Sequence, residues 1–568
     1  MVTVRRSAVA IFFICLVAVS SAFGSATNIY ITQSGSPSGN CTTNVQTPAF
    51  FNNAANWGSG ASQIGPGTTV LLCGTFTFAS GGNGLTVQGS GTNGNPITIN
   101  FDTGAILQAP YFGGNGNNSC SGQPCGGAIS IYNENYITVN GQNTGIIQNT
   151  ANGSSLANQA PSVGLYASGD HILIKNLTIE NIYLNTSAES SATPGFNSAD
   201  LLIDNGSTNV EVCENYLNNA HMGITGNAAG PTSYIAGPTN ACADTQAATG
   251  LNFYSNTLVD HAWHLQMAAT NYANYYNNDL SGWSNWFYPT GGSAYHTDGI
   301  FVDSVTTTIQ IAYIYNNYVH GDFVGGSPTG FLHCSVQGAN SSGHGSSCHA
   351  FNNVFIGMGG TANQGSAVWG HAGSIGPHYF YNNTIVGFCC SITQEGDNTI
   401  QFTFENNIFV PGTGGAGPFF YYQTSPPGAP ISHFTGAGND YYTTGTPNWN
   451  LGDPGQSFNA LSSWKSALSG GGSPNADTGS VNNNPSLTGS YTLNSGSAAV
   501  GIGENLTSLG IAALDIGAPQ TFGVGGSCGT GCLPRPASGA WDAGAYPRSS
   551  NNASAPPAPP QGLTATVR

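Results

Sequence analysis

A short phrase recurs through the middle of the chain and constrains its fold more than any other feature. Each copy places an aromatic residue before Asn or Asn-Asn, followed by alternating apolar residues. Copies lie at residues 254–258, 276–280, 315–319, 351–355, 381–385 and 404–408, and the segments 174–179 and 213–217 fit the same frame. The last Asn recurs after 22 residues (256 to 278) to 41 residues (215 to 256). Such repetition indicates a solenoid whose coils hold three short strands with loop insertions.

This pattern predicts an all-β chain folded as a right-handed parallel β-helix. Strands of successive coils stack ~4.8 Å apart and turn alternate residues into an apolar interior. The right-handed crossover is the strongly favoured hand. Asn suits a buried turn of such a coil, because it tolerates unusual backbone angles and its amide can bond to the coils on either side. We therefore assign the recurring Asn a structural role.

The composition agrees with a β protein whose surface is polar but nearly uncharged. Of 568 residues, 81 are Gly, 39% are hydrophobic and only 5% are charged. A disordered chain would carry more charge and fewer apolar residues. Helices need charged outer faces, and Gly, Asn, Ser and Thr form helices weakly. The formal charge of −17 lacks the basic footprint of a nucleic-acid binder, so nucleic-acid partners are excluded.

The N-terminus predicts export. Residues 1–24 read as a signal peptide, in which Arg5 and Arg6 precede an apolar run too short for a stable membrane anchor. We expect a secreted, extracellular protein that is monomeric and has no membrane attachment once the signal is removed.

The cysteines also fit an oxidising compartment. Twelve of the 13 remain after signal removal, an even number. Sequence does not fix connectivity, but close spacing favours the pairs Cys41–Cys73, Cys120–Cys125, Cys213–Cys242, Cys334–Cys348 and Cys528–Cys532. The adjacent Cys389 and Cys390 are the least suited to pairing, since a vicinal disulfide is strained.

Three further segments carry a resemblance to a known superfamily. Residues 91–99 (GTNGNPITI) and the stretch 129–141 are similar to the first coils of the pectate-lyase-like β-helix superfamily, and Arg535-Pro536 with residues 541–546 (WDAGAY) to the closing segment of its secreted bacterial members. The resemblance covers about residues 28–546 and implies the β-helix fold. It does not select a reaction, because the superfamily contains lyases, hydrolases, epimerases and non-enzymatic adhesins.

The chain divides into five predicted parts. These are a signal peptide (1–24), an N-terminal cap with the first strands (25–79), the parallel β-helix (80–440), a Gly/Ser/Asn-rich C-terminal capping segment (441–548) and a Pro/Ala-rich, linker-like tail (549–568).

Residues 295–300 (YHTDGI) resemble the N-T-D-G motif of the polygalacturonase family, with His296 at the Asn position, and residues 343–345 resemble its G-H-G. Inverting hydrolysis needs one carboxylic acid and one carboxylate that activates water. The resemblance implies that Asp298 acts with Asp322 or Asp303, and that His344 or His320 tunes them. The family's paired Asp is reduced to Gly321-Asp322 and its R-I-K is absent, so a purely structural turn at Asp298 stays open.

Ten of the 12 histidines lie between His221 and His378. Equivalent positions on successive coils stack, so we expect these residues to line one elongated outer groove; the alternative is that His replaces Ser or Thr on a polar face. Aromatic side chains near them are potential platforms for sugar rings. The substrate-binding candidates are His221, His261, His264, Trp263, Trp283, Trp286 and Tyr295.

No Lys or Arg lies between residues 176 and 464. This absence opposes an arginine-based lyase and an acidic substrate, so a neutral extracellular polysaccharide cleaved by a cofactor-independent hydrolase is the favoured interpretation. Two alternatives remain: a non-enzymatic surface or adhesion protein, and a Ca²⁺-dependent lyase or C5-epimerase whose Asp side chains bind the ion. The His-Cys pair at residues 333–334 and the Cys-His pair at 348–349 could together bind zinc, but in an exported protein a disulfide between the two cysteines is the favoured interpretation.

Overall fold

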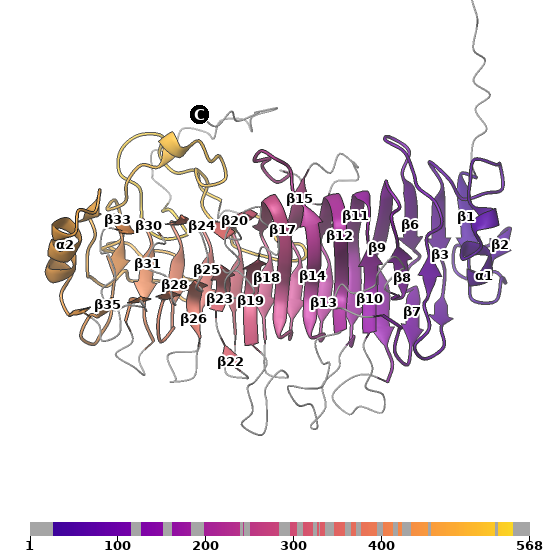
Figure 1. Cartoon of the computed structure of the whole chain (residues 1–568), viewed down its shortest axis with the longest axis horizontal. Helices are drawn as coiled ribbons and strands as arrows, with labels where there is room; N and C mark the ends of the chain where they lie inside the picture. Colours follow the sequence, from indigo (N-terminus) through magenta and orange to yellow (C-terminus); the bar gives the residue numbers. More distant parts are fainter. Residues whose placement is uncertain are drawn as a thin grey trace, which may run out of the picture.

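The computed structural model describes residues 26–114, 126–151, 162–182, 198–238, 242, 250–282, 296–303, 310–321, 327–328, 330–334, 346–357, 365–370, 377–394, 401–412, 418–422, 433–451, 456–528 and 532–548. They form one long rod in which strands are stacked along the long axis (Figure 1). The rod is a parallel β-helix, which confirms the predicted fold class.

Each coil contributes to three stacks of parallel strands, called A, B and C. Stack A holds β5 (Leu85–Thr86), β8 (Ile129–Ile131), β10 (Ser162–Ala167), β14 (Met222–Ala229), β19 (His296–Asp303), β23 (Gly330–Cys334), β26 (Ser366–Gly370), β29 (Ile392–Gln394), β32 (Phe420–Tyr422) and β35 (Trp449–Leu451).

Stack B holds β1 (Asn28–Ile31), β3 (Thr69–Leu72), β6 (Ile97–Phe101), β15 (Leu251–Tyr254), β20 (Gln310–Tyr315), β24 (Ser346–Phe351), β27 (His378–Tyr381), β30 (Phe402–Glu405), β33 (Phe434–Ala437) and β37 (Ala476–Thr478). Stack C holds β4 (Thr75–Thr77), β7 (Ile106–Ala109), β13 (Tyr216–Asn218), β16 (Thr257–Val259), β18 (Asp279–Ser281), β21 (Tyr318–His320), β25 (Val354–Ile356), β28 (Thr384–Val386), β31 (Ile408–Val410) and β34 (Asp440–Tyr441).

Four long strands turn a corner between stacks. β12 (Ser198–Cys213) and β17 (Trp263–Tyr276) run from stack A into stack B, whereas β9 (Ile137–Asn149) and β11 (Asp170–Glu180) run from stack B into stack C. Alternate residues of the strands point inward and form one continuous apolar core along the rod, and most of its members are fully buried.

A ladder of buried Asn side chains marks the turn between stacks B and C. Each amide donates to the Oδ1 of the next Asn at 3.0–3.2 Å, and each Oδ1 also accepts the backbone N–H of the Asn before it at 2.9–3.1 Å. The prediction that this Asn bonds to neighbouring coils is confirmed. The ladder comprises Asn215, Asn256, Asn278, Asn317, Asn353, Asn383, Asn407 and Asn439.

The residue before each ladder Asn has a left-handed backbone. In the Asn-Asn copies this residue is the first Asn, with φ between 52° and 62° at Asn277, Asn316, Asn352, Asn382 and Asn406. Asn is one of the few side chains that tolerates this conformation. The two Asn of the phrase therefore have different roles: the first makes the bend and the second joins the coils.

Residues 441–481 continue the rod and then close it. The helix α2 (Leu461–Gly470) places Trp464 over the end of the apolar interior, where the ring lies 5.8 Å from that of Phe420 and 6.1 Å from that of Trp449. The Trp464 indole donates to the Asp477 carboxylate at 2.8 Å. At the other end lie β2 (Val45–Gln46), the short helix α1 (Pro48–Phe51) and the 3₁₀ turn η1 (Ala54–Asn56).

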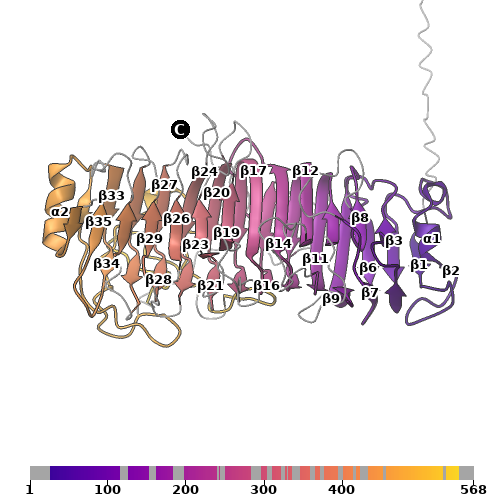
Figure 2. The same ribbon diagram turned by 60° about the horizontal axis from the view of Figure 1, so that its bottom comes forward.

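The second half of the expected capping segment does not cap the rod. Residues 482–548, here called the C-terminal strap, run back along its side beneath stack C (Figure 2). The amide of Glu504 bonds to Asn406, whereas that of Gly525 reaches Glu214, many coils earlier. Leu506, Leu514 and Trp541 of the strap cover an outward ladder of aromatic rings formed by Tyr254, Tyr276, Tyr315, Phe351 and Tyr381. The first four rings are spaced 4.7–4.9 Å apart.

Four predicted disulfides are present: Cys41–Cys73, Cys213–Cys242, Cys334–Cys348 and Cys528–Cys532. They fit an extracellular protein. Cys120–Cys125, the signal peptide and the tail lie outside the described residues. Within the described ranges, no helix has the length and hydropathy needed to cross a membrane.

Candidate functional site

The outward-facing residues of stack A form a continuous ladder of aromatic and polar side chains. Each member is paired with the next along the rod, because every strand of the stack keeps the same register. Gln266, Trp369 and Tyr421 are partly exposed. We call this surface the A face; its ladder runs Tyr166, Leu202, Thr225, Gln266, Phe301, His333, Trp369, Thr393 and Tyr421.

Asp298 lies on the A face, beside the middle of this ladder. It pairs with the partly exposed Trp263 on the preceding strand, and its Oδ1 accepts the backbone N–H of Gly330 at 3.1 Å. The Nδ1 atom of His333 is 3.8 Å from the same Oδ1. Aromatic rings flank the pair: Phe301 stacks on Trp263 at 5.7 Å and meets the His333 ring edge-on at 4.3 Å.

This arrangement offers a carboxyl group and an imidazole, the two most common groups in acid–base catalysis. Asp298 is 0% exposed and His333 6%, so the pair is recessed beneath the surface of the face. The recess favours proton transfer in a site that excludes water. It also means that a substrate reaches Asp298 only where neighbouring groups give way.

The length of β19 decides whether Asp303 can be the second carboxylate of the predicted pair. Asp303 ends β19 five residues beyond Asp298, which separates their Cα atoms by about 16 Å in an extended strand. Inverting hydrolysis needs about 6.5–9.5 Å between carboxyl groups. Asp303 is therefore a poor partner, and Asp322 remains the predicted one.

Several predicted site residues cannot be placed by their side chains. Only the backbone is described for His296 and Asp303, at the two ends of β19. The residues that lie outside the described ranges are Asp322, His344, Trp283, Trp286 and Tyr295.

The predicted outer groove of histidines is wrong for three of its members. His221, His261 and His264 are 0% exposed. His261 bonds through Nε2 to the buried Asp200 carboxyl at 2.8 Å, and His264 bonds through Nε2 to the Ser281 carbonyl at 2.9 Å. The stacking of equivalent positions on successive coils does not fix the side of the wall to which a side chain points.

Burial governs the protonation of these histidines. It lowers the pKa of His221 to about 3 and that of His264 to about 4, and it holds the pKa of His261 well below its usual range. Burial raises the pKa of the Asp200 carboxyl well above its ordinary value. Burial therefore favours the uncharged form of each of these four groups.

His320, a predicted catalytic residue, belongs to another surface. It lies on β21 in stack C, where its Nε2 is 2.8 Å from the Asp279 Oδ1 and both side chains are 29% exposed. Its ring stacks on Tyr318 at 4.0 Å. His320 thus bonds to Asp279 near the strap and is not part of the A face.

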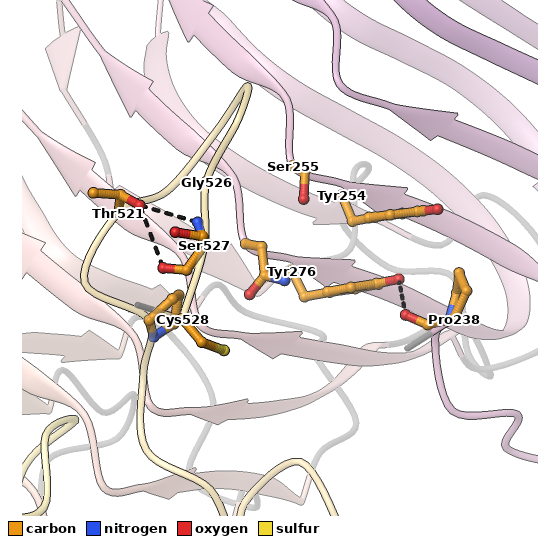
Figure 3. Close-up of a pocket in the computed structure, with 10 residues that line it drawn as sticks. Pro238, Tyr254, Ser255, Tyr276, Thr521, Gly526, Ser527 and Cys528 are labelled. Atoms are coloured by element: carbon orange, nitrogen blue, oxygen red, sulfur yellow. Dashed lines mark hydrogen bonds between the residues drawn. The ribbon is translucent and has the colours of Figure 1, made fainter. Parts of the chain in front are cut away.

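A separate small pocket lies between stacks B and C and the strap (Figure 3). Its volume of about 190 Å³ is below the ~300 Å³ at which ligand pockets begin. Tyr276 donates to the Pro238 carbonyl at its edge. The pocket contains no predicted substrate-binding or catalytic residue, so we attribute it to imperfect packing of the strap.

One group within the described residues has potential metal ligands within 4.8 Å of one another: Cys334, Cys348 and His378. The two sulfurs form a disulfide and are not thiolates, while His378 Nδ1 accepts the Cys348 backbone N–H at 3.1 Å. These three residues therefore form a structural cluster, in line with the disulfide predicted there.

The sequence interpretation missed His333 as a neighbour of Asp298. The sequence indicates His333 only as a possible zinc ligand beside Cys334. The available signal was alternation: Cys334 must point inward to reach Cys348, so His333 must point outward onto the A face.

Fold and site together define the class: a parallel β-helix protein with an aromatic and polar ladder on one outer face. No protein-family model matches the chain, and no curated protein matches it.

Seven chains of solved structures are similar to it. The lacto-N-biosidase of family GH136 from Eubacterium ramulus is 14% identical (69% of this chain, 65% of that one, TM-score 0.44). The match therefore spans less than two thirds of that enzyme. Pectate lyase Pel9A is 14% identical (88% and 97%, TM-score 0.38), as is the endo-xylogalacturonan hydrolase from Aspergillus tubingensis (64% and 84%, TM-score 0.27). These likenesses are too distant to bear on the reaction of this chain.

Proposed function

We propose that this protein is a secreted glycoside hydrolase that binds a neutral extracellular polysaccharide along the A face. Asp298 is the general acid, and Asp322 is the base that activates water. The observation that carries the proposal is the position of Asp298 on an outer face, next to His333 and beside the stacked rings of Trp263 and Phe301.

The geometry of the face supports an extended ligand. Its ladder residues repeat with the strand spacing of ~4.8 Å, so Trp263 and Trp369, three strands apart, are separated by about 14 Å along the rod. Planar rings spread along the rod in this way suit the apolar faces of well-separated sugars in one extended glycan. Polar members between them, such as Gln266 and Thr225, can bond to hydroxyl groups; they already bond to each other at 2.7 Å.

Charge supports a neutral ligand. The A face is built from strands β10 to β32, and the sequence that supplies them after Lys175 contains no Lys or Arg before Lys465. A polyuronate would meet carboxylates there without a cation to balance them.

The test is hydrolysis of a panel of neutral and acidic polysaccharides by the mature protein, with and without Ca²⁺, read as reducing ends and as ultraviolet absorbance of unsaturated products. Asp298→Asn keeps an oxygen that can accept the Gly330 N–H, so the fold is preserved while the acid is lost. We expect kcat to fall by 10²- to 10⁴-fold with the affinity for glycan retained. Asp279→Asn, which makes the same change on β18 in stack C, away from the A face, is the matched control and is expected to retain activity.

Unsaturated products that require Ca²⁺ would replace the hydrolase with a lyase. A second candidate, binding without cleavage, is favoured by one observation: the complete burial of the Asp298 side chain. Glycan binding with no product from any substrate, unchanged in Asp298→Asn, would establish it. Loss of binding in Trp263→Ala would then still place the ligand on the A face.

A further inference from the structure

Two adjacent cysteines lie in the turn that leads from β28 to β29, on the way into stack A. The sulfur of Cys389 is 3.3 Å from that of Cys390, and both side chains are half-buried. The eight other cysteines of the described chain form four disulfides. A protein that holds four disulfides therefore also holds a close pair of thiols.

We propose that Cys389 and Cys390 form a redox site that closes reversibly into a vicinal disulfide. The sulfurs need to approach by little more than 1 Å to reach the bonding distance of about 2.05 Å. Adjacent residues have Cα atoms about 3.8 Å apart, whereas disulfides normally span about 4.4–6.8 Å. The ring is therefore strained, and strained disulfides are the more easily reduced ones. The four other bridges join residues at least four positions apart and lack this constraint.

The reaction consumes a low-molecular-weight disulfide. The Cys389 thiolate attacks one sulfur of the oxidant, forms a mixed disulfide and releases one small thiol. The Cys390 sulfur then displaces the second small thiol as the ring closes. One disulfide is broken and one is formed, two electrons pass to the oxidant, and the two thiol protons end on the released thiols.

The surroundings assign the order of attack. The neighbouring Cys390 thiol lowers the pKa of Cys389 through the hydrogen bond between the two sulfurs, whereas that same bond together with burial raises the pKa of Cys390. The thiolate is the nucleophile in this exchange, so Cys389 attacks first and Cys390 resolves.

Thr393 connects the cysteine pair to the A face, so formation of the disulfide affects that face. The side chain of Cys390 hydrogen-bonds to Thr393, whose Oγ1 also bonds to the Ser366 hydroxyl. Thr393 stands in the ladder between Trp369 and Tyr421. A change at Cys390 therefore alters the polar contacts between two aromatic members of the face.

The test uses the mature protein in native buffer with either reduced or oxidised glutathione. Native alkylation with iodoacetamide follows, then intact mass and peptide mapping. We expect two alkyl groups per molecule after reduced glutathione and none after oxidised glutathione, with a loss of two hydrogens that maps to residues 389–390. The other bridges stay closed in both. The Cys390→Ser control, which lacks the resolving sulfur, is expected to hold one glutathione on Cys389 that cannot be displaced.

Three results would overturn the proposal: two alkylatable thiols after oxidised glutathione, a stable mixed disulfide on the wild-type protein, or a 389–390 bridge that opens only together with the structural ones. Mass spectrometry on the wild-type chain decides the matter even where a variant does not fold. Since the readout contains no glycan, it is independent of the proposed hydrolysis. Tryptophan fluorescence in the two redox states then reports whether Trp369 senses the change.

Discussion

Replacing either Asn of one repeat phrase by Gly separates the two roles that the structure assigns to them. Asn317 is a buried ladder residue. Its amide donates to the Tyr275 carbonyl at 2.9 Å and to Asn353 Oδ1 at 3.0 Å, and its own Oδ1 accepts the backbone N–H and the side-chain amide of Asn278. The preceding Asn316 has φ 54° and needs only a residue that tolerates this bend.

The expected magnitudes follow from these contacts. Asn317→Gly removes four hydrogen bonds at about 1 kcal/mol each, and the backbone freedom of Gly adds about 0.5–1 kcal/mol. The loss of unfolding free energy is therefore about 4–5 kcal/mol. Asn316→Gly keeps the bond from its backbone N–H to the Phe351 carbonyl and relieves the strain of a left-handed side chain, so its change stays within about 1 kcal/mol.

Thermal unfolding followed by circular dichroism measures the difference. With an unfolding entropy of about 2.1 cal/mol/K per residue, about 500 residues that unfold together lose roughly 1 °C in Tm per kcal/mol. We expect a fall of about 4–5 °C for Asn317→Gly and at most about 1 °C for Asn316→Gly. Equal shifts would refute the division of roles. Asn317→Asp, which keeps the shape and removes the donors, tests whether hydrogen bonds rather than packing carry the loss.

Two further predictions concern buried groups. Burial lowers the pKa of His378 to about 3. Below about pH 6.5 the unfolded chain binds a proton at this residue and the folded chain does not. The free energy of unfolding therefore falls by about 1.4 kcal/mol for each pH unit below that value. His378→Asn keeps an acceptor for the Cys348 N–H, and its Tm deficit relative to wild type is expected to narrow from pH 7 to pH 5; a constant deficit would contradict this linkage. Arg535 is buried and donates from Nη2 to Asn352 Oδ1 at 2.7 Å, so Arg535→Met is expected to make the strap cleavable by protease before the rod, whereas the exposed Arg548→Met is not. Identical digestion patterns in the two variants would show that Arg535 does not hold the strap.

The fold could be predicted because its signal is local and repeated. The Asn phrase marks a turn whose geometry and hydrogen bonds involve the same few residues in every coil. The ladder even continues to Asn439, which the phrase misses because Gly438 takes the left-handed position there, with φ 61°. The strap could not be predicted in this way. Its contacts join residues more than 150 positions apart, such as Asn382 with Gly544, and no local pattern records them.

The site was harder to predict, since a strand reverses its faces with every residue. The stretches beginning at Asp200 and Asp298 look alike in sequence, yet Leu201 and Ile300 occupy equivalent inward positions through Ile224 and Leu265. The extra Gly299 before Ile300 shifts the acidic residue by one place. Asp200 consequently faces the interior and bonds to His261, whereas Asp298 faces outward beside Trp263. A one-residue offset thus converts a structural carboxyl into a candidate catalytic one.

The same offset gives the Asp200 and Asp298 carboxyl groups different surroundings. An inward Asp is tolerated only when it is neutral, and burial raises the pKa of Asp200 accordingly. Asp298 is equally buried but lies on the outer side of the wall, where its Oδ1 accepts the Gly330 N–H at 3.1 Å and lies 3.8 Å from the His333 Nδ1. The lack of Lys and Arg between residues 176 and 464 therefore costs the fold little, and it leaves the A face to hydrogen bonds and aromatic rings, which are the groups that recognise an uncharged sugar.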